Sequence, residues 1–150
     1  MQQARQQWQA RQRSLKPQRL VFLDETATST NMTRRYGRAL RSQRCVGAVP
    51  HGHWKSTTFI AGLRHDGVIA PLVIDGPMDG QMFLAWVREC LCPALSAGDI
   101  VIADNLSCHK VAGVAQAILA RGASIWYLPA YSPDLNPIEK MFAKLKALLR

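Results

Sequence analysis

The two most apolar runs of the chain, LVFLD and IVIAD, each end in an aspartate, and this pattern restricts the fold more than any other feature. Short aliphatic runs bounded by polar residues are typical of buried strands. Asp24 and Asp104 are therefore expected at the carboxyl ends of two such strands, where ligand sites of α/β sheets lie. Each residue also has a structural explanation, because Asp24 can cap a turn and Asp104 can form an Asx-turn with Asn105.

The remaining elements follow from hydrophobic periodicity and turn chemistry. Residues 56–76 predict a hairpin that turns at Asp66-Gly67, and Pro71 places its second arm at a sheet edge. Asp79 is the expected N-cap of a helix that Pro93 ends. Further predicted elements are a first strand at 19–25, a short strand at 44–50, a strand at 99–105, a helix over 111–119, a strand at 124–129 and a helix from 137 onward. This order predicts an α/β fold, with a mixed central sheet and helices packed on it.

Composition is that of one domain of 150 residues with 48% hydrophobic content. Residues 1–18 are polar and basic with little to bury, so we expect an N-terminal arm or linker before a domain at 19–150. No apolar run approaches the roughly 18 residues of a membrane span. The 4 cysteines lack C-x-x-C spacing and are expected to be reduced. These features favour a cytoplasmic protein without a membrane partner.

The net charge of +9 is clustered rather than dispersed. Clustered cations gain affinity for nucleic acid by releasing counterions from phosphates, although each cluster alone is equally well explained as a solvated basic face. With so basic a chain, two strand-end carboxylates favour phosphodiester chemistry at a divalent cation. The basic clusters are Arg5, Arg11, Arg13, Lys16 and Arg19; Arg34, Arg35, Arg38, Arg41 and Arg44; and Lys140, Lys144, Lys146 and Arg150.

A third acid opens the last predicted helix, in the stretch YLPAYSPDLNPIEKMFAKLK. Asn136 fits the N-cap position and Pro137 the first helical position, which places Glu139 where a glutamate completes a capping box. Capping alone would explain these residue types. It does not explain the three prolines of residues 128–137, the proline-rich approach to this helix. These prolines restrict the backbone and determine where the first helical turn lies.

Three motifs together resemble the DDE transposases of the mariner superfamily, specifically the bacterial insertion-sequence branch. They are LDE at 23–25, ADNLSCHK at 103–110 and YLPAYSPDLNPIEKMFAKLK at 127–146. Between Asp104 and Glu139 lie 34 residues (105–138), the spacing of that branch. The last motif with this spacing is specific, whereas LDE alone would mean little. The resemblance covers residues 19–150 and implies an RNase H-like catalytic domain.

The resemblance implies that Asp24, Asp104 and Glu139 are the catalytic, metal-binding triad. Two Mg²⁺ or Mn²⁺ ions, bound with substrate, would support DNA strand cleavage and strand transfer by two-metal phosphoryl transfer. His109 matches a histidine of the family and, with Asn105, is an expected auxiliary residue that orients substrate or a carboxylate. A local role for His109 at the start of a helix is an equal alternative.

The same resemblance implies double-stranded DNA as partner, in the form of transposon ends and target, and allows a homodimer. It places the protein in the bacterial cytoplasm, associated with the nucleoid. The basic residues expected to contact DNA are Arg34, Arg35, Arg38, Arg41, Lys140 and Lys144.

The chain departs from the family in extent. Full transposases of this type carry an N-terminal helix-turn-helix region, whereas only the basic arm precedes the first strand here, and the last helix is cut short at Arg150. We therefore expect a catalytic domain, a second-frame product or a truncated element. Two alternatives stay open: a catalytically idle DNA-binding or dimerisation remnant, and another RNase H-like nuclease.

Overall fold

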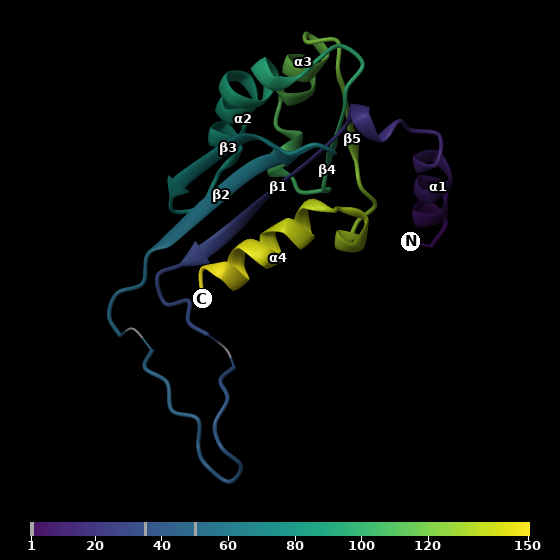
Figure 1. Cartoon of the computed structure of the whole chain (residues 1–150). Coiled ribbons are helices and arrows are strands. Elements are labelled where there is room, and N and C mark those ends of the chain that lie inside the picture. Colours follow the sequence, from purple (N-terminus) through teal and green to yellow (C-terminus); the bar gives the residue numbers. More distant parts are fainter. Residues whose placement is uncertain (1, 35, 50) are drawn as a thin grey trace.

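The computed structural model describes residues 2–34, 36–49 and 51–150, which form one five-stranded sheet with helices on both faces (Figure 1). The strand order is β3-β2-β1-β4-β5. The first three strands pair antiparallel, while β1, β4 and β5 pair parallel, so the predicted mixed sheet is confirmed. The strands are β1 (Leu20–Ser29), β2 (Ser56–Leu63), β3 (Val68–Asp75), β4 (Ile100–Ala103) and β5 (Ser124–Tyr127).

The four α-helices are α1 (Gln2–Gln12), α2 (Gly80–Trp86), α3 (Val114–Leu119) and α4 (Ile138–Leu148). Asp79 caps α2 as expected, because its side chain accepts a hydrogen bond from the Met82 N–H at 2.8 Å. The helix continues through a π-helical turn (Val87–Leu91) and a 3₁₀ turn (Cys92–Ala94) that contains Pro93. Other 3₁₀ turns are Pro17–Arg19, Cys108–Lys110 and Pro133–Leu135. None of the described helices has the length and hydropathy that crossing a membrane requires.

Alternation along β1 divides its side chains between two cores. Val21 and Leu23 pack with buried residues of α2 and α3, whereas Leu20 and Phe22 pack with α1 and with Phe142 of α4. Successive side chains of a strand point to opposite faces, so α2 and α3 cover one face of the sheet and α1 and α4 cover the other. This division decides on which face each polar residue of β1 lies.

The hairpin is confirmed, but its turn lies one residue earlier than predicted. Arg64 donates its N–H to the Gly67 carbonyl at 2.8 Å, so His65 and Asp66 are the central residues between β2 and β3. Pro71 lies on β3, at the edge of the sheet. The first strand is longer than predicted, because antiparallel pairing with β2 extends β1 to Ser29. The predicted strand at 44–50 is wrong for residues 44–49, which are irregular, and Pro50 lies outside the described residues. These residues belong to the long β1–β2 connection, which projects away from the sheet (Figure 1).

The N-terminal basic segment contains a docked helix rather than a chain with little to bury. Trp8 is 8% exposed and meets Trp126 of β5 edge to face, with ring centroids 6.1 Å apart. The Arg11 guanidinium lies 3.6 Å from the centre of the same ring, and Arg5 bonds both carboxylate oxygens of Asp134 at 3.0 and 2.6 Å. One tryptophan and two arginines therefore anchor α1. A domain boundary near residue 19 stays a prediction.

Trp8→Ala should detach α1, because Trp8 is the only buried residue of that helix. We expect the free energy of unfolding to fall on the order of 3 kcal/mol, the scale for truncating a buried aromatic residue. Trypsin should then cleave at Arg5, Arg11 and Arg13 much faster than in the parent protein. Gln9→Ala, on the exposed side of α1, is the control and should leave both measurements unchanged. Equal cleavage rates for Trp8→Ala and the parent would contradict the docking.

Candidate active site

Strand β1, which carries Asp24, and strand β4, which ends just before Asp104, are neighbours and pair in parallel. In the register of β1 and β4, Phe22 pairs with Ile102, and each aspartate follows its paired residue by two positions. Because side chains alternate, both aspartates are placed on the face that carries α4. One detail differs from the prediction: Asp104 follows the end of β4, but Asp24 lies inside β1, where the parallel ladder ends and the pairing with β2 continues.

Glu139 joins the two aspartates from a separate segment. It lies in the first turn of α4, on the same face of the sheet. All three acids line one pocket of about 340 Å³, which is completed by residues 128–133, Asn105, Leu106 and Asn136. Strand β1, the end of β4 and the start of α4 thus bring together the three acids that the sequence singled out.

The capping box predicted at the start of α4 is not formed. Pro137 occupies the N-cap position, and no side chain caps the helix. The Asn136 side chain instead donates from Nδ2 to Asp24 Oδ2 at 3.2 Å. With its nitrogen bonded to Asp24, the amide places no oxygen on the N–H groups of the first helical turn. Glu139 contributes only its backbone N–H, which donates to the Asn136 carbonyl at 3.3 Å.

Burial and neighbouring charges act together on Asp24, which is 6% exposed. Burial, followed by the charges of Asp104, Glu139 and Glu25, raises its pKa to about 7, although the Glu25 N–H opposes this by donating to Oδ1 at 2.8 Å. Carboxylates that repel one another in a pocket are the oxygen ligands that divalent cations prefer. The donor set therefore fits Mg²⁺ or Mn²⁺.

Asp104 differs from Asp24 because a histidine compensates its charge. Asp104 Oδ1 accepts a hydrogen bond from the Leu106 N–H at 3.1 Å and forms an ion pair with His109 Nδ1 at 2.6 Å. Burial would raise the pKa of Asp104, but His109 and the Leu106 N–H outweigh burial and lower it. The pocket thus combines one carboxylate that resists ionisation with one that is held ionised.

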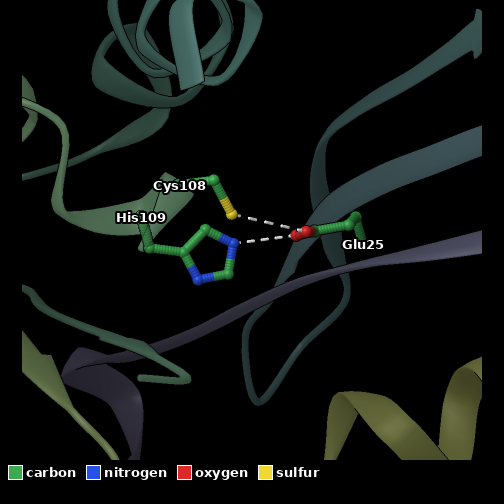
Figure 2. Close-up of side chains that lie close together, drawn as sticks. All are labelled: Glu25, Cys108 and His109. Atoms are coloured by element: carbon green, nitrogen blue, oxygen red, sulfur yellow. Dashed lines mark hydrogen bonds and ion pairs between the residues drawn. The ribbon is translucent and has the colours of Figure 1, made fainter. Parts of the chain in front are cut away.

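His109 also contacts Glu25, and with Cys108 these residues place three potential metal ligands within 4.8 Å of one another (Figure 2). His109 Nε2 lies 2.8 Å from Glu25 Oε2. Burial alone would lower the pKa of His109, yet Asp104 and Glu25 raise it to about 9. Burial and Glu25 also raise the pKa of the Cys108 thiol. The raised pKa of His109 favours its protonated form, in which the ring forms an ion pair with Glu25 and Asp104.

The sequence did not identify Glu25 as a partner of this site. Glu25 follows Asp24 directly, so alternation along β1 sends it to the opposite face, toward α2 and α3. His109 reaches both acids from the 3₁₀ turn after β4, with its ring 4.6 Å from that of Phe83 and its carbonyl accepting the Tyr127 hydroxyl at 3.0 Å. The expectation of a histidine that orients a carboxylate agrees with this contact.

The described residues among those expected to bind DNA lie outside the pocket. Arg34, Arg38 and Arg41 are exposed on the β1–β2 connection, and Lys140 and Lys144 are exposed on α4. Arg35 lies outside the described residues. Asn105 is also exposed, but unlike these residues it lines the pocket of the three acids.

A mixed sheet of this order, with helices on both faces, is an RNase H-like fold. Residues 19–150 match the model of the DDE superfamily endonucleases, and the chain belongs to that family. In a comparison with curated proteins, no sequence matched.

Solved structures similar to the chain include complexes of Mos1 transposase. Its paired-end complex with the left transposon end is 20% identical with a TM-score of 0.74, covering 98% of this chain and 47% of that one. The Mos1 strand transfer complex is 20% identical with a TM-score of 0.77, at 98% and 46% coverage. The catalytic domain of Mos1 mariner transposase is 18% identical with a TM-score of 0.65, at 98% and 68% coverage. The chain thus spans about half the length of the Mos1 chains in the two complexes.

Asp24→Asn should stabilise the protein at pH 8 in the absence of divalent cations. An unfolded chain ionises this group near 3.8, whereas burial and nearby carboxylates raise its folded pKa to about 7. The stability from the neutral carboxyl is therefore present below pH 3.8 and is lost as the pH rises through 7. We expect a gain in unfolding free energy on the order of 2 kcal/mol at pH 8, measured by urea denaturation, and little gain at pH 4.

Asp99→Asn is the matched control, because Asp99 is equally buried but is paired with Arg64. Burial would raise the pKa of Asp99, but Arg64 and the Ser96 N–H lower it, so neutralising this residue should destabilise the protein at pH 8. Destabilisation by both substitutions at pH 8 would show that Asp24 is not under electrostatic strain.

Proposed function

We propose that this chain is the catalytic domain of a transposase of the mariner superfamily, in its bacterial insertion-sequence branch, and that it cleaves and joins DNA strands. One observation carries the proposal: in a DDE superfamily endonuclease, Asp24, Asp104 and Glu139 come from three distant segments to line one pocket. The spacing of the last two acids supports the insertion-sequence branch.

In this proposal Asp24, Asp104 and Glu139 hold the divalent cations. Two bound Mg²⁺ or Mn²⁺ ions would activate water or a DNA 3′-hydroxyl and stabilise the leaving oxygen of an in-line displacement. The raised pKa of Asp24 supports this assignment, since bound cations would stabilise a carboxylate that burial and nearby acids make costly to ionise. Mos1 paired-end complexes solved with Mg and with Mn give further support.

The remaining residues of the site act on the carboxylates. His109 keeps Asp104 ionised and fixes one of its oxygens, while Glu25 holds the far side of the imidazole ring. The proline-rich approach positions the first turn of α4 and with it Glu139. Nucleophilic serine or cysteine residues have no part in the proposed reaction.

The proposed substrate is double-stranded DNA, as transposon ends and target. The net charge of +9 and the exposed arginines of the β1–β2 connection support it. The Mos1 structures include a complex with a transposon end and a strand transfer complex, and their paired ends favour a homodimer. A bacterial transposase would act in the cytoplasm, at the nucleoid.

Glu139→Gln tests the proposed triad. Glutamine keeps the size of glutamate but carries no charge and binds Mg²⁺ poorly, so cleavage of a DNA duplex with Mn²⁺ should fall by more than the roughly 10- to 100-fold typical of an outer-shell residue. Folding should change only by the helix-dipole contribution, about 0.3 to 1 kcal/mol. Glu89→Gln, at an exposed glutamate after α2, should cleave like the parent. Full activity of Glu139→Gln would remove Glu139 from the site, and DNA binding without cleavage by the parent would support an idle DNA-binding remnant.

Salt dependence tests the proposed DNA contacts. If the basic clusters follow a duplex, log affinity should fall against log salt with a slope of about −0.9 per phosphate neutralised. Replacing Arg34, Arg35 and Arg38 by alanine should flatten this slope by roughly 2 to 3, with little dependence on DNA sequence. Replacing Arg88 and Arg121, which are exposed near α2 and α3, should leave it nearly unchanged. A slope near zero in the parent would exclude nucleic acid as the partner.

A further inference from the structure

Asn136 occupies an unusual position for an amide side chain. It is 3% exposed, lines the pocket of the three acids, and donates from Nδ2 to Asp24 Oδ2 at 3.2 Å. The two residues are 112 positions apart in sequence, so this bond joins the proline-rich approach to the central strand β1.

The bond determines the orientation of the amide. The amide nitrogen, which is the donor of this side chain, faces Asp24 Oδ2, so the amide oxygen points elsewhere. That oxygen, Oδ1, is buried and has no hydrogen-bond partner among the described residues. An unpaired buried acceptor destabilises a fold, whereas an apolar side chain of the same shape would carry no such cost. Stability alone therefore does not explain an asparagine at this position.

The local backbone does not explain it either. The Asn136 N–H donates to the Pro133 carbonyl at 3.0 Å, and the Asn136 carbonyl accepts the Glu139 N–H at 3.3 Å. Nearly any residue could form these two main-chain bonds. The side chain caps no described helix, and among the described residues Asp24 is its one hydrogen-bond partner.

We propose that Asn136 is a positioning residue that fixes the Asp24 carboxylate for cation binding and links it to the turn that carries Glu139. The inference rests on the proposed function. The Glu25 N–H holds Asp24 Oδ1 at 2.8 Å and Asn136 Nδ2 holds Oδ2, so the carboxylate plane cannot rotate freely. Each oxygen keeps a further lone pair for a cation. The backbone of Asn136 bonds Glu139 while its side chain bonds Asp24, which couples the positions of two carboxylates.

Asn136→Leu and Asn136→Ala separate positioning from packing. We expect the Mn²⁺ affinity of the full chain without DNA, measured from the EPR signal of free Mn²⁺, to fall 10- to 100-fold in both variants. Leucine keeps the volume and removes the unpaired oxygen, so the melting temperature of Asn136→Leu without metal should not fall. If the leucine variant does not fold, Asn136→Ala supplies the same measurement of affinity.

Thr58→Val is the matched control, because Thr58 is also a buried polar residue of the sheet and donates from Oγ1 to the Gly76 carbonyl at 2.6 Å, away from the pocket. Thr58→Val should have a lower melting temperature than the parent but bind Mn²⁺ with the same affinity. Parental Mn²⁺ affinity in both Asn136 variants would overturn the positioning role and leave the proposed function intact. A parent protein that binds no Mn²⁺ would overturn the proposed function, and this inference with it.

Discussion

Repulsion among carboxylates in one pocket is the constraint on which the rest of the site depends. Asp24, Asp104 and Glu139 meet where the parallel pairing of β1 and β4 ends, and burial with these like charges raises the pKa of Asp24 to about 7. Contacts within the site compensate part of this unfavourable electrostatic energy. His109, held between Glu25 and Asp104, keeps Asp104 ionised, whereas Asp24 has only neutral donors as partners. The pKa of Asp24 is therefore raised while that of the neighbouring Asp104 is lowered. A divalent cation would compensate the negative charge that remains.

The proline-rich approach to α4 connects this pocket to helix α1 at the other end of the chain. Its prolines limit backbone freedom, and Arg5 of α1 bonds Ser132 at 2.9 Å as well as Asp134. The tryptophan pair of α1 and β5 holds α1 against the same face of the sheet. The N-terminal helix thus braces the loop that presents Asn136 and Glu139, so helix docking and site geometry are physically connected.

Local patterns in the sequence were sufficient for much of this architecture. The apolar runs before Asp24 and Asp104 correctly predicted two buried strands, which the structure then pairs in parallel. The hairpin, to within one residue of its turn, and the Asp79 cap were also correct, because hairpin turns and helix caps depend on residues within a few positions of one another. Glu139 was found by the spacing of its motif, since its chemistry cannot be separated from capping by residue type alone.

Only the tertiary structure decided which partners the buried polar groups take. The sequence by itself determined the two strands that lead to Asp24 and Asp104, the hairpin, the last helix and the three acids that line one pocket. It could not determine that Asn136 bonds Asp24 instead of capping α4, that His109 joins Glu25 to Asp104, or that Trp8 docks a polar helix. Hydrophobic periodicity and turn chemistry act over a few residues. The contacts of Asn136 with Asp24, His109 with Glu25 and Trp8 with Trp126 instead join segments about 80 to 120 positions apart, where the choice of partner depends on how the sheet and helices pack.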